Sequence, residues 1–276
     1  MNPTPKLAMF NSFAGFGRIS ITAALPVCAA LNVQVCPAPT AVLSSHLAYQ
    51  PCFLQDFTDM LPSYIKAWED IGLTFEGVHV GYVRNAAQLE TIQGFLSSKC
   101  VTPDTIIVLD PVMGDCGKAY STITEEHICS MKDFIQASHI ITPNITEACL
   151  LTGIPMKEQG YTLEELHHLC EKLDPSQKKK IVITGIEDGT NITNCIWEAG
   201  NITLHSIPSA GNSRHGTGDI FSSILAAEAL HGTSFTCSIS KASEFISLCM
   251  QDSDTHNIPI KEGILYENNL SWLKNI

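Results

Sequence analysis

Short apolar runs alternate with longer amphipathic segments along most of this chain. The apolar runs predict strands near residues 6–10, 33–37, 77–82, 105–112, 139–144 and 178–185. The segments between them predict helices over 20–32, 59–72, 85–99, 124–138, 145–153 and 162–173. Strands that alternate with helices indicate βαβ crossovers and a mainly parallel sheet. Continuous apolar strands such as IIVL and IVI are typical of a sheet covered on both faces.

The pattern changes after Gly185. TNCIWEAGNITLHSIP, residues 193–208, predicts a β-hairpin that turns at Ala199-Gly200-Asn201, and an amphipathic helix begins near Asp219. No internal repeat, low-complexity segment or linker interrupts residues 1–276, so we expect one α/β domain with a three-layer, doubly wound, mainly parallel sheet. In such folds ligands bind beyond the carboxyl ends of the strands.

Composition narrows the class of protein. The chain has 276 residues, of which 45% are hydrophobic and 16% charged, which is typical of a folded domain. A net charge of −12 and a pI near 5.2 offer no footprint for nucleic acid or anionic membranes. We see no secretory signal and no apolar run long enough for a membrane span. The 11 cysteines are scattered without a CxxC motif, so we expect a cytoplasmic protein with reduced thiols.

The segment HGTGD opens the last predicted helix. Gly216 and Gly218 flank Thr217 and allow the backbone to bend or to approach a ligand closely. The loop N–H groups and the helix dipole together predict an anion site. Asp219 stands beside that site and could take a proton from an attacking hydroxyl, as phosphoryl transfer requires. An ordinary loop followed by an acidic helix start explains these residues equally well.

Two further polar clusters follow predicted strands. In LDPVMGD, Asp110 ends a buried strand, where it could serve a Mg²⁺ site or merely begin a turn. In TPNITEA, the spacing of Asn144 and Glu147 favours a capping box, a role that is compatible with phosphate and metal binding. There is no Walker motif, and FNSFAGFGR lacks the third glycine of a dinucleotide fingerprint.

Taken together, these motifs resemble the ribokinase-like superfamily and, within it, the pyridoxal kinases. The order Asp110, then Asn144 and Glu147, then Asp219 carries the resemblance, which covers nearly the whole chain. The stretches AMFNSFAGFGRISITAA, PTAVLSSHLAY and VGYV are similar to the opening segment, the Thr-x-x-x-Ser-x-His stretch and the Gly-Tyr of that family.

The resemblance implies transfer of the γ-phosphate of ATP to the 5′-hydroxymethyl group of a vitamin B6 vitamer, with Mg²⁺. Asp219 would be the base, and an anion hole would consist of Gly216, Thr217 and Gly218. The pyridine pocket would be lined by Ser12, Thr40, His46 and Tyr82. ATP would be held by Asp110, Asn144, Glu147 and Thr184, with Asp110 and Glu147 serving the metal. A minimal lid and a homodimer are implied as well, and a monovalent-cation requirement stays open.

Some positions depart from the family pattern. Gly185 stands where some bacterial members carry a lysine, and Arg214 or Lys118 could compensate. Val83-Arg84-Asn85 replaces a usually glycine-rich stretch after Gly-Tyr. Two alternatives therefore stay open: a hydroxymethylpyrimidine kinase of the same superfamily, and a non-catalytic B6-binding protein on this fold.

Overall fold

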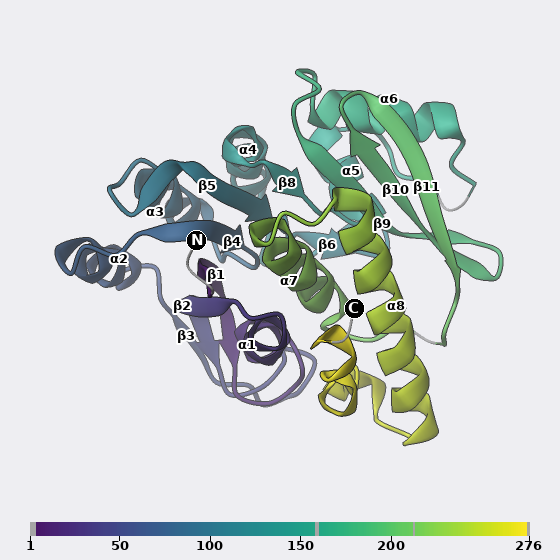
Figure 1. Ribbon diagram of the computed structural model, residues 1–276, viewed down its shortest axis with the longest axis horizontal. Coiled ribbons are helices and arrows are strands. Elements are labelled where there is room, and N and C mark those ends of the chain that lie inside the picture. Colours follow the sequence, from purple (N-terminus) through teal and green to yellow (C-terminus); the bar gives the residue numbers. More distant parts are fainter. Residues whose placement is uncertain (1–3, 158–159, 212, 275–276) are drawn as a thin grey trace.

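A nine-stranded mixed sheet runs through the centre of the computed structural model, which describes residues 4–157, 160–211 and 213–274 (Figure 1). The strand order is β11-β10-β9-β8-β5-β4-β1-β2-β3. The strands from β9 to β2 in this order are mutually parallel, while β3, β10 and β11 add antiparallel edges. The strands are β1 (Lys6–Ala14), β2 (Gln34–Leu43), β3 (Leu54–Asp56), β4 (Phe75–Val80), β5 (Val101–Leu109), β8 (Ile140–Ile141), β9 (Lys180–Asp188), β10 (Asn191–Glu198) and β11 (Asn201–Pro208). The doubly wound, mainly parallel sheet expected from the sequence is confirmed.

Helices cover both faces of this sheet (Figure 1). One layer holds α1, α7 and α8, and the other holds the helices from α2 to α6. Their bounds are α1 (Ser20–Ala30), α2 (Leu61–Asp70), α3 (Ala86–Leu96), α4 (Glu125–Phe134), α5 (Ile145–Thr152), α6 (Leu163–Leu173), α7 (Thr217–Leu230) and α8 (Phe235–Thr255). Short 3-10 turns follow at Ile135–Ala137, Ile260–Glu262, Glu267–Asn269 and Trp272–Lys274.

Strand β1 contributes side chains to both hydrophobic cores, one on each face of the sheet. Successive strand side chains point to opposite faces of a sheet. Leu7 and Met9 pack with α1, α7 and α8, whereas Ala8 and Phe10 pack with the opposite helix layer. All four side chains are at most 1% exposed, so the strand reads as one continuous apolar run. This explains why a two-sided sheet could be expected from its strands.

The edge hairpin turns where the sequence indicated. β10 and β11 pair from Asn191↔Pro208 to Glu198↔Asn201, and Ala199 and Gly200 form the two-residue loop. Both loop residues have positive φ, 50° and 78°. Such a turn matches the right-handed twist of the strands.

Three elements differ from the sequence expectation. The strand expected at 33–37 continues to Leu43 and pairs with the unpredicted β3. A small hairpin of β6 (Gly114–Asp115) and β7 (Lys118–Ala119) stands outside the main sheet. α8 was not predicted, because its segment mixes Ser, Thr, Cys and Lys with only a few apolar positions. Apart from the β6–β7 hairpin, the described residues add no second sheet, which agrees with a minimal lid.

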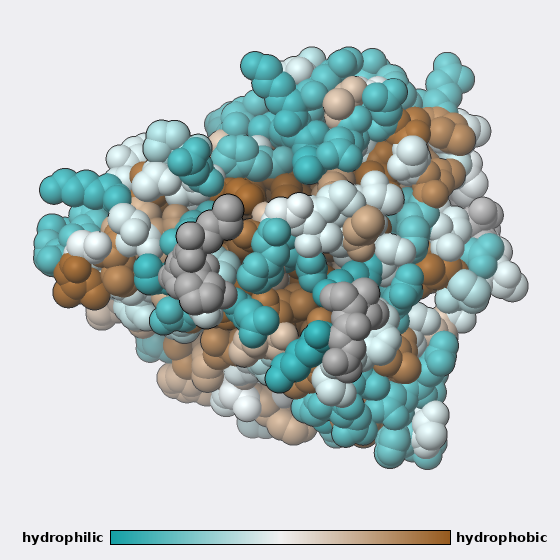
Figure 2. All heavy atoms as spheres, viewed as in Figure 1, coloured by the Kyte–Doolittle hydropathy of each residue, from teal (hydrophilic) through white to brown (hydrophobic). Residues whose placement is uncertain are grey.

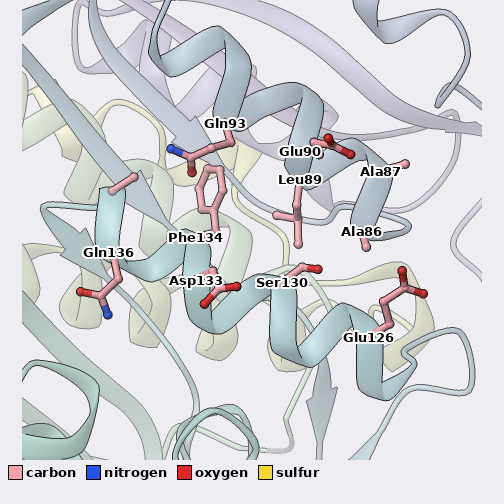
Figure 3. Close-up of a pocket in the computed structure, with 11 residues that line it drawn as sticks. Ala86, Ala87, Leu89, Glu90, Gln93, Glu126, Ser130, Asp133, Phe134 and Gln136 are labelled. Atoms are coloured by element: carbon pink, nitrogen blue, oxygen red, sulfur yellow. The ribbon is translucent and has the colours of Figure 1, made fainter.

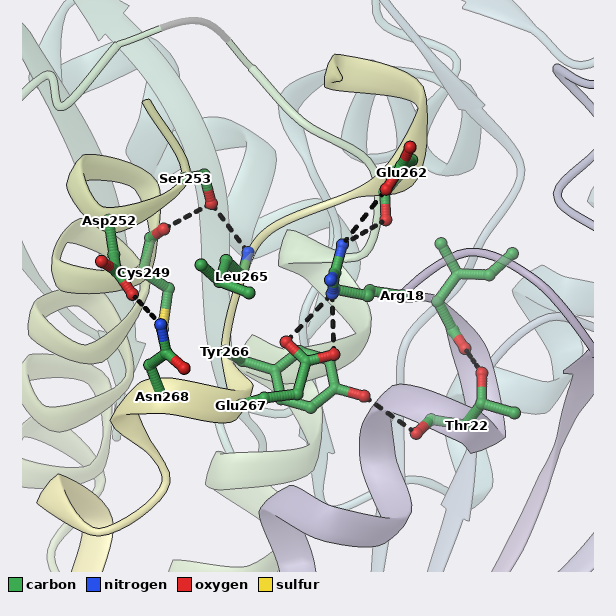
Figure 4. Close-up of polar contacts among 11 residues, drawn as sticks. Arg18, Thr22, Cys249, Asp252, Ser253, Glu262, Leu265, Tyr266, Glu267 and Asn268 are labelled. Carbon is green, nitrogen blue, oxygen red and sulfur yellow. Dashed lines mark hydrogen bonds and ion pairs between the residues drawn. The ribbon is translucent and has the colours of Figure 1, made fainter. Parts of the chain in front are cut away.

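The segment after α8 reaches back to the loop that follows β1 (Figure 4). The Arg18 backbone N–H donates to the Glu262 carbonyl oxygen at 3.1 Å. The Arg18 guanidinium donates through Nε to both carboxylate oxygens of Glu267, at 2.8 and 3.0 Å. The Tyr266 hydroxyl donates to the carbonyl oxygen of Thr22 at 3.2 Å. Residues near the two ends of the chain thus fix the same loop.

Hydrophilic residues cover much of the face seen in Figure 2, with apolar patches between them. Within the described part of the chain, no helix combines the length and the apolar character needed to cross a membrane.

We expect the aromatic cluster beneath the sheet to be a main source of stability. The Phe95 ring lies 5.1 Å from that of Phe10 and 5.9 Å from that of Phe75 between centroids, and Phe95 is 2% exposed. Phe95→Ala should lower the free energy of unfolding by about 3–5 kcal/mol, the usual cost of truncating a buried phenylalanine. Phe53→Ala is the matched control, because Phe53 is 64% exposed and should change it by less than about 0.5 kcal/mol. Equal losses in urea titrations would contradict this assignment.

Candidate active site

Polar side chains gather at the carboxyl edge of the sheet, around the point where the strand order reverses. The chain runs from β1 outward to β2 and then returns to β4 on the other side of β1. Asn11 lies in the last part of β1, Tyr82 follows β4, and Asp110 follows β5. Ligands bind at such a switch point in doubly wound sheets. Asn144 and Thr184, which form an isolated bridge, extend the same edge toward β9.

The N-terminus of α7 faces this edge. Gly216 is the N-cap residue and has a left-handed backbone with φ 85°. A Cβ at this position would lie 1.9 Å from the carbonyl oxygen of Arg18, so only glycine fits here. No side chain caps the helix. Its first N–H groups, from Thr217 to Asp219, therefore remain available to an anion.

Asp219 lies in the first turn of α7 and is partly exposed at the site. The Asn11 side-chain amide donates to its carboxylate at 3.1 Å. Burial of the carboxyl raises the pKa of Asp219, while hydrogen bonding from the Ser20 backbone N–H and from Asn11 opposes this rise. The carboxylate is thus held on two sides and made more basic than an ordinary aspartate.

Asp110 stands beside it as a second, more deeply buried acid. Burial and the neighbouring charge of Asp219 raise the pKa of Asp110 to about 7. The Ser222 hydroxyl donates to Asp110 Oδ2 at 3.1 Å, and His79 Nε2 lies 3.0 Å from the same hydroxyl. A Cβ on Gly218 would lie 3.9 Å from Asp110 Oδ2, which places this acid against the first turn of α7.

Asn144 and Glu147 form the capping box that their spacing indicated. Asn144 Oδ1 accepts from the Glu147 N–H at 2.9 Å, and Glu147 Oε2 accepts from the Asn144 N–H at 2.8 Å. Glu147 Oε1 also accepts from the Met113 N–H at 3.1 Å. Burial and the Asp110 charge raise the pKa of Glu147, against these backbone hydrogen bonds. Capping therefore does not remove Glu147 from the acidic cluster.

No group of three or more His, Cys, Asp or Glu side chains among the described residues is arranged to hold a metal directly. Mg²⁺ needs no such cage, because it keeps several waters and binds through one or two carboxylates and substrate phosphates. Asp110 and Glu147 raise each other's proton affinity, and a cation between them would relieve that repulsion. The residues present thus fit a mainly water-mediated Mg²⁺ site.

The residues expected around the ring lie on the β1–β2–β4 side. Ser12 and Thr40 are buried, at 4% and 0% exposure. The Thr40 hydroxyl donates to the Tyr82 carbonyl oxygen at 2.7 Å, so Thr40 fixes Tyr82 in place. The Tyr82 hydroxyl is buried and has no hydrogen-bond partner among the described residues.

His46 lies in the loop between β2 and β3 and closes against the loop before α7. Its ring lies 4.0 Å from that of His215, centroid to centroid. Burial and the neighbouring His215 lower the pKa of His46 to about 4, and burial lowers that of His215. Both rings are therefore neutral near pH 7 and can stack. His215 adjoins the HGTG glycines, yet nothing in the sequence distinguished it as a site residue.

Arg214 and Lys118 are the two residues suggested as substitutes for a lysine at Gly185, and the structure treats them differently. The Arg214 guanidinium is 4% exposed and is taken up by Asp254 Oδ1 at 2.6 Å and the Ile258 carbonyl oxygen at 2.7 Å. The guanidinium therefore holds the C-terminal part of α8 and is not available to a ligand. Lys118 is exposed on the β6–β7 hairpin, which rests on the start of α5 through Gly117 N–H and Thr146 Oγ1 at 3.0 Å. Of the two residues, only Lys118 has an exposed side chain.

A groove of about 660 Å³ opens elsewhere, between α3 and α4 (Figure 3). Leu89 and Phe134 contribute apolar surface, and Glu90, Glu126 and Asp133 contribute acids. It contains none of the motif residues and no nucleophile paired with a base. We therefore place the active site at the sheet edge.

Comparison with known proteins shows the family to which the chain belongs. The family model described as Phosphomethylpyrimidine kinase matches residues 21–265. The chain belongs to this family. A candidate phosphomethylpyrimidine kinase from Bacteroides thetaiotaomicron, crystallised with pyridoxal, superposes on this family member with a TM-score of 0.92. The two chains are 30% identical, and the match covers 98% of this chain and 96% of the other.

Two sequence relatives carry different names within this phosphomethylpyrimidine kinase family. A candidate pyridoxal kinase of Schizosaccharomyces pombe is 29% identical over 201 residues, which are 69% of this chain and 57% of that protein. A hydroxymethylpyrimidine/phosphomethylpyrimidine kinase of Aquifex aeolicus is 28% identical over 199 residues, 71% of this chain and 74% of that one. The chain thus spans little more than half of the Schizosaccharomyces protein. These two names point to different substrates, pyridoxal in one case and hydroxymethylpyrimidine in the other.

Gly216 and Gly218 should respond differently to the same substitution. Gly216→Ala would place a methyl group against the Arg18 carbonyl oxygen on a left-handed backbone, and we expect a loss of about 2 kcal/mol or more in unfolding free energy. Gly218→Ala meets nothing closer than 3.9 Å and should leave stability within about 0.5 kcal/mol of the wild type. Chemical denaturation of both variants checks this, and an equal loss would refute the close approach at Gly216.

Asp219→Asn should stabilise the protein at high pH. Burial and the Asp219 charge raise the pKa of Asp110 to about 7, so the folded state binds an extra proton at Asp110 and stability is lost as pH rises from about 4 to about 7. Removing the Asp219 charge removes part of that loss. With EDTA present, we expect a melting temperature near that of the wild type at pH 5 and roughly 2–4 °C higher at pH 8.

Asp133→Asn is the control for this pH dependence, since Asp133 is an exposed carboxylate on α4. It should show no pH-dependent gain. A gain for Asp219→Asn that is the same at pH 5 and pH 8 would mean that charge repulsion is not its cause.

Proposed function

We propose that this protein transfers the γ-phosphoryl group of ATP to the 5′-hydroxymethyl group of pyridoxal, pyridoxamine or pyridoxine. The observation that carries the proposal is the place of Asp219. Its carboxylate stands beside the uncapped N-terminus of α7, at the switch point of the sheet. A base for the attacking hydroxyl and N–H groups for the transferred phosphoryl group would therefore lie side by side.

The proposed role of Asp219 is general base catalysis. An alcohol is a poor acid, so the carboxylate takes the proton as the new oxygen–phosphorus bond forms. Burial raises the pKa of Asp219 and makes it a stronger acceptor at that moment. Asn11 holds one of its oxygens, which limits the directions from which a hydroxyl can approach. The N–H groups from Thr217 to Asp219 would stabilise the transferred group.

The triphosphate would lie along the edge from Asp110 to Thr184. Asn144 and Thr184 border this edge, and Asp110 and Glu147 supply its negative charge. Mg²⁺, when bound with ATP, supplies the positive charge that neutralises the phosphates. Asp110 and Glu147 would hold it mostly through water, and Ser222 would keep the Asp110 carboxylate oriented.

The choice of a B6 ring rests on the pocket side and on one relative. Ser12 offers a hydroxyl group, and His46 and Tyr82 offer two aromatic surfaces, which suit a substituted pyridine; Thr40 holds Tyr82 in place behind them. The Bacteroides relative, although titled a candidate phosphomethylpyrimidine kinase, was crystallised with pyridoxal. A hydroxymethylpyrimidine kinase is the second candidate, because its substrate also carries a CH₂OH group on a nitrogen ring.

The direct test is ATP consumption by the purified protein with Mg²⁺. Pyridoxal, pyridoxamine, pyridoxine and hydroxymethylpyrimidine are compared in parallel, with Asp219→Ala beside the wild type. We expect turnover of a B6 vitamer and a fall in kcat of about 10²–10⁴-fold in the variant, the usual contribution of general acid–base catalysis.

Other results would redirect the proposal. Turnover of hydroxymethylpyrimidine alone would keep the mechanism and change the substrate. Binding of a B6 vitamer without turnover would favour a non-catalytic binding protein. Full activity in Asp219→Ala would remove Asp219 from the reaction.

A further inference from the structure

Ser20, the first residue of α1, has an unusual backbone. Its φ is 53°, in the left-handed region that side chains with a Cβ avoid. Five other non-glycine residues of the described chain have positive φ, namely Asn32, Cys116, Gln177, Ala199 and Asn257. All five are exposed and lie in turns or bends, whereas Ser20 is 4% exposed. Such strain persists where the surroundings enforce it, and it clusters at functional sites.

The residue contacts both halves of the proposed site. On one side, its backbone N–H faces the Asp219 carboxylate, where it lowers the pKa of that group against the effect of burial. On the other side, its hydroxyl oxygen accepts from the Ser12 hydroxyl at 2.8 Å. A right-handed backbone at Ser20 would change the direction of its side chain relative to its N–H. The unfavourable φ thus lets one residue meet the base and the ring pocket together.

The contact with Ser12 fixes which kind of hydrogen bond Ser12 can offer. A serine hydroxyl has one hydrogen to donate and two lone pairs to accept with. Ser12 gives its hydrogen to Ser20, so toward a ligand it can act only as an acceptor. A ring group that donates, such as a pyridinium N–H or a phenolic O–H, is matched to it, and a bare ring nitrogen is not.

We propose that Ser20 is a positioning residue that orients the Ser12 hydroxyl as an acceptor toward the ring and its own N–H toward Asp219. This inference rests on the proposed function, because it assigns the ring to the Ser12 side. It predicts that Ser20 acts on ring binding through Ser12, and not independently of it.

A double-mutant cycle of Ser12→Ala and Ser20→Ala tests this coupling. Each single variant should raise KM for pyridoxal about tenfold with little change in kcat, because one ordered hydrogen bond is lost. The double variant should be no worse than about tenfold, since Ser20 has no further effect once the Ser12 hydroxyl is gone. Ser223→Ala is the control: Ser223 is a fully buried serine whose hydroxyl has no partner among the described residues.

Several results would overturn the proposal. They are an unchanged KM in Ser20→Ala, a loss in the double variant that equals the product of the single losses, and an equal loss in Ser223→Ala. Melting temperatures add a second readout. Ser20→Gly should melt above Ser20→Ala, because glycine adopts a left-handed backbone without strain. The reverse order would refute the account of the backbone.

The cycle separates this inference from the proposed function. If the wild type phosphorylates hydroxymethylpyrimidine instead, the same cycle is measured with that substrate, and absence of coupling overturns the role of Ser20. If pyridoxal binds without turnover, the kinase proposal fails. The double-mutant cycle is then measured with Kd values from calorimetry in place of KM values. If no ring compound binds, both proposals fail.

Discussion

Two like charges share the centre of this molecule. Asp110 and Asp219 come from distant parts of the chain, and each raises the cost of ionising the other in a partly desolvated place. Much of the surrounding architecture serves to hold them there. β5 delivers Asp110 to the sheet edge, α7 delivers Asp219, and both acids receive hydrogen bonds from neighbouring polar side chains. A protein would not keep such a pair for stability, since repulsion between buried carboxylates opposes folding.

The polar residues behind the two acids form separate supports. Asn11 spans β1, the turn after β4 and α7, because its amide donates to Asp219 while its oxygen accepts from the backbone N–H groups of Ser12 and Tyr82. A Cβ at Gly81 would lie 2.4 Å from the Asn11 amide nitrogen, so the turn after β4 leaves room for this one side chain. The turn after β4 and the Asp219 carboxylate are therefore coupled through a single buried amide, independently of Ser20.

Much of the fold could be read from local pattern, and the reasons for the failures are physical. Strands buried on both faces are apolar throughout, so β1, β5 and β9 were evident. α8 escaped notice because it buries residues such as Ser238, Ser243 and Ser253, which carry no hydrophobic periodicity. Asp110, Glu147 and Asp219 could be predicted as site candidates because they follow strands or open helices. Ser20 and Ser222 were not, because an ordinary serine in a helix reveals neither a left-handed backbone nor a carboxylate behind it until the chain is folded.

The bond between Arg18 and the segment after α8 bears on the order in which this protein can be completed. Because translation proceeds from the N-terminus to the C-terminus, the loop after β1 leaves the ribosome long before Glu262 and Glu267. During that interval the loop lacks the partners that hold it in the finished structure, and Gly216, which packs against the Arg18 carbonyl oxygen, has not yet arrived to meet a fixed surface. A nascent chain thus carries most of its sheet before it carries the contacts that fix this loop.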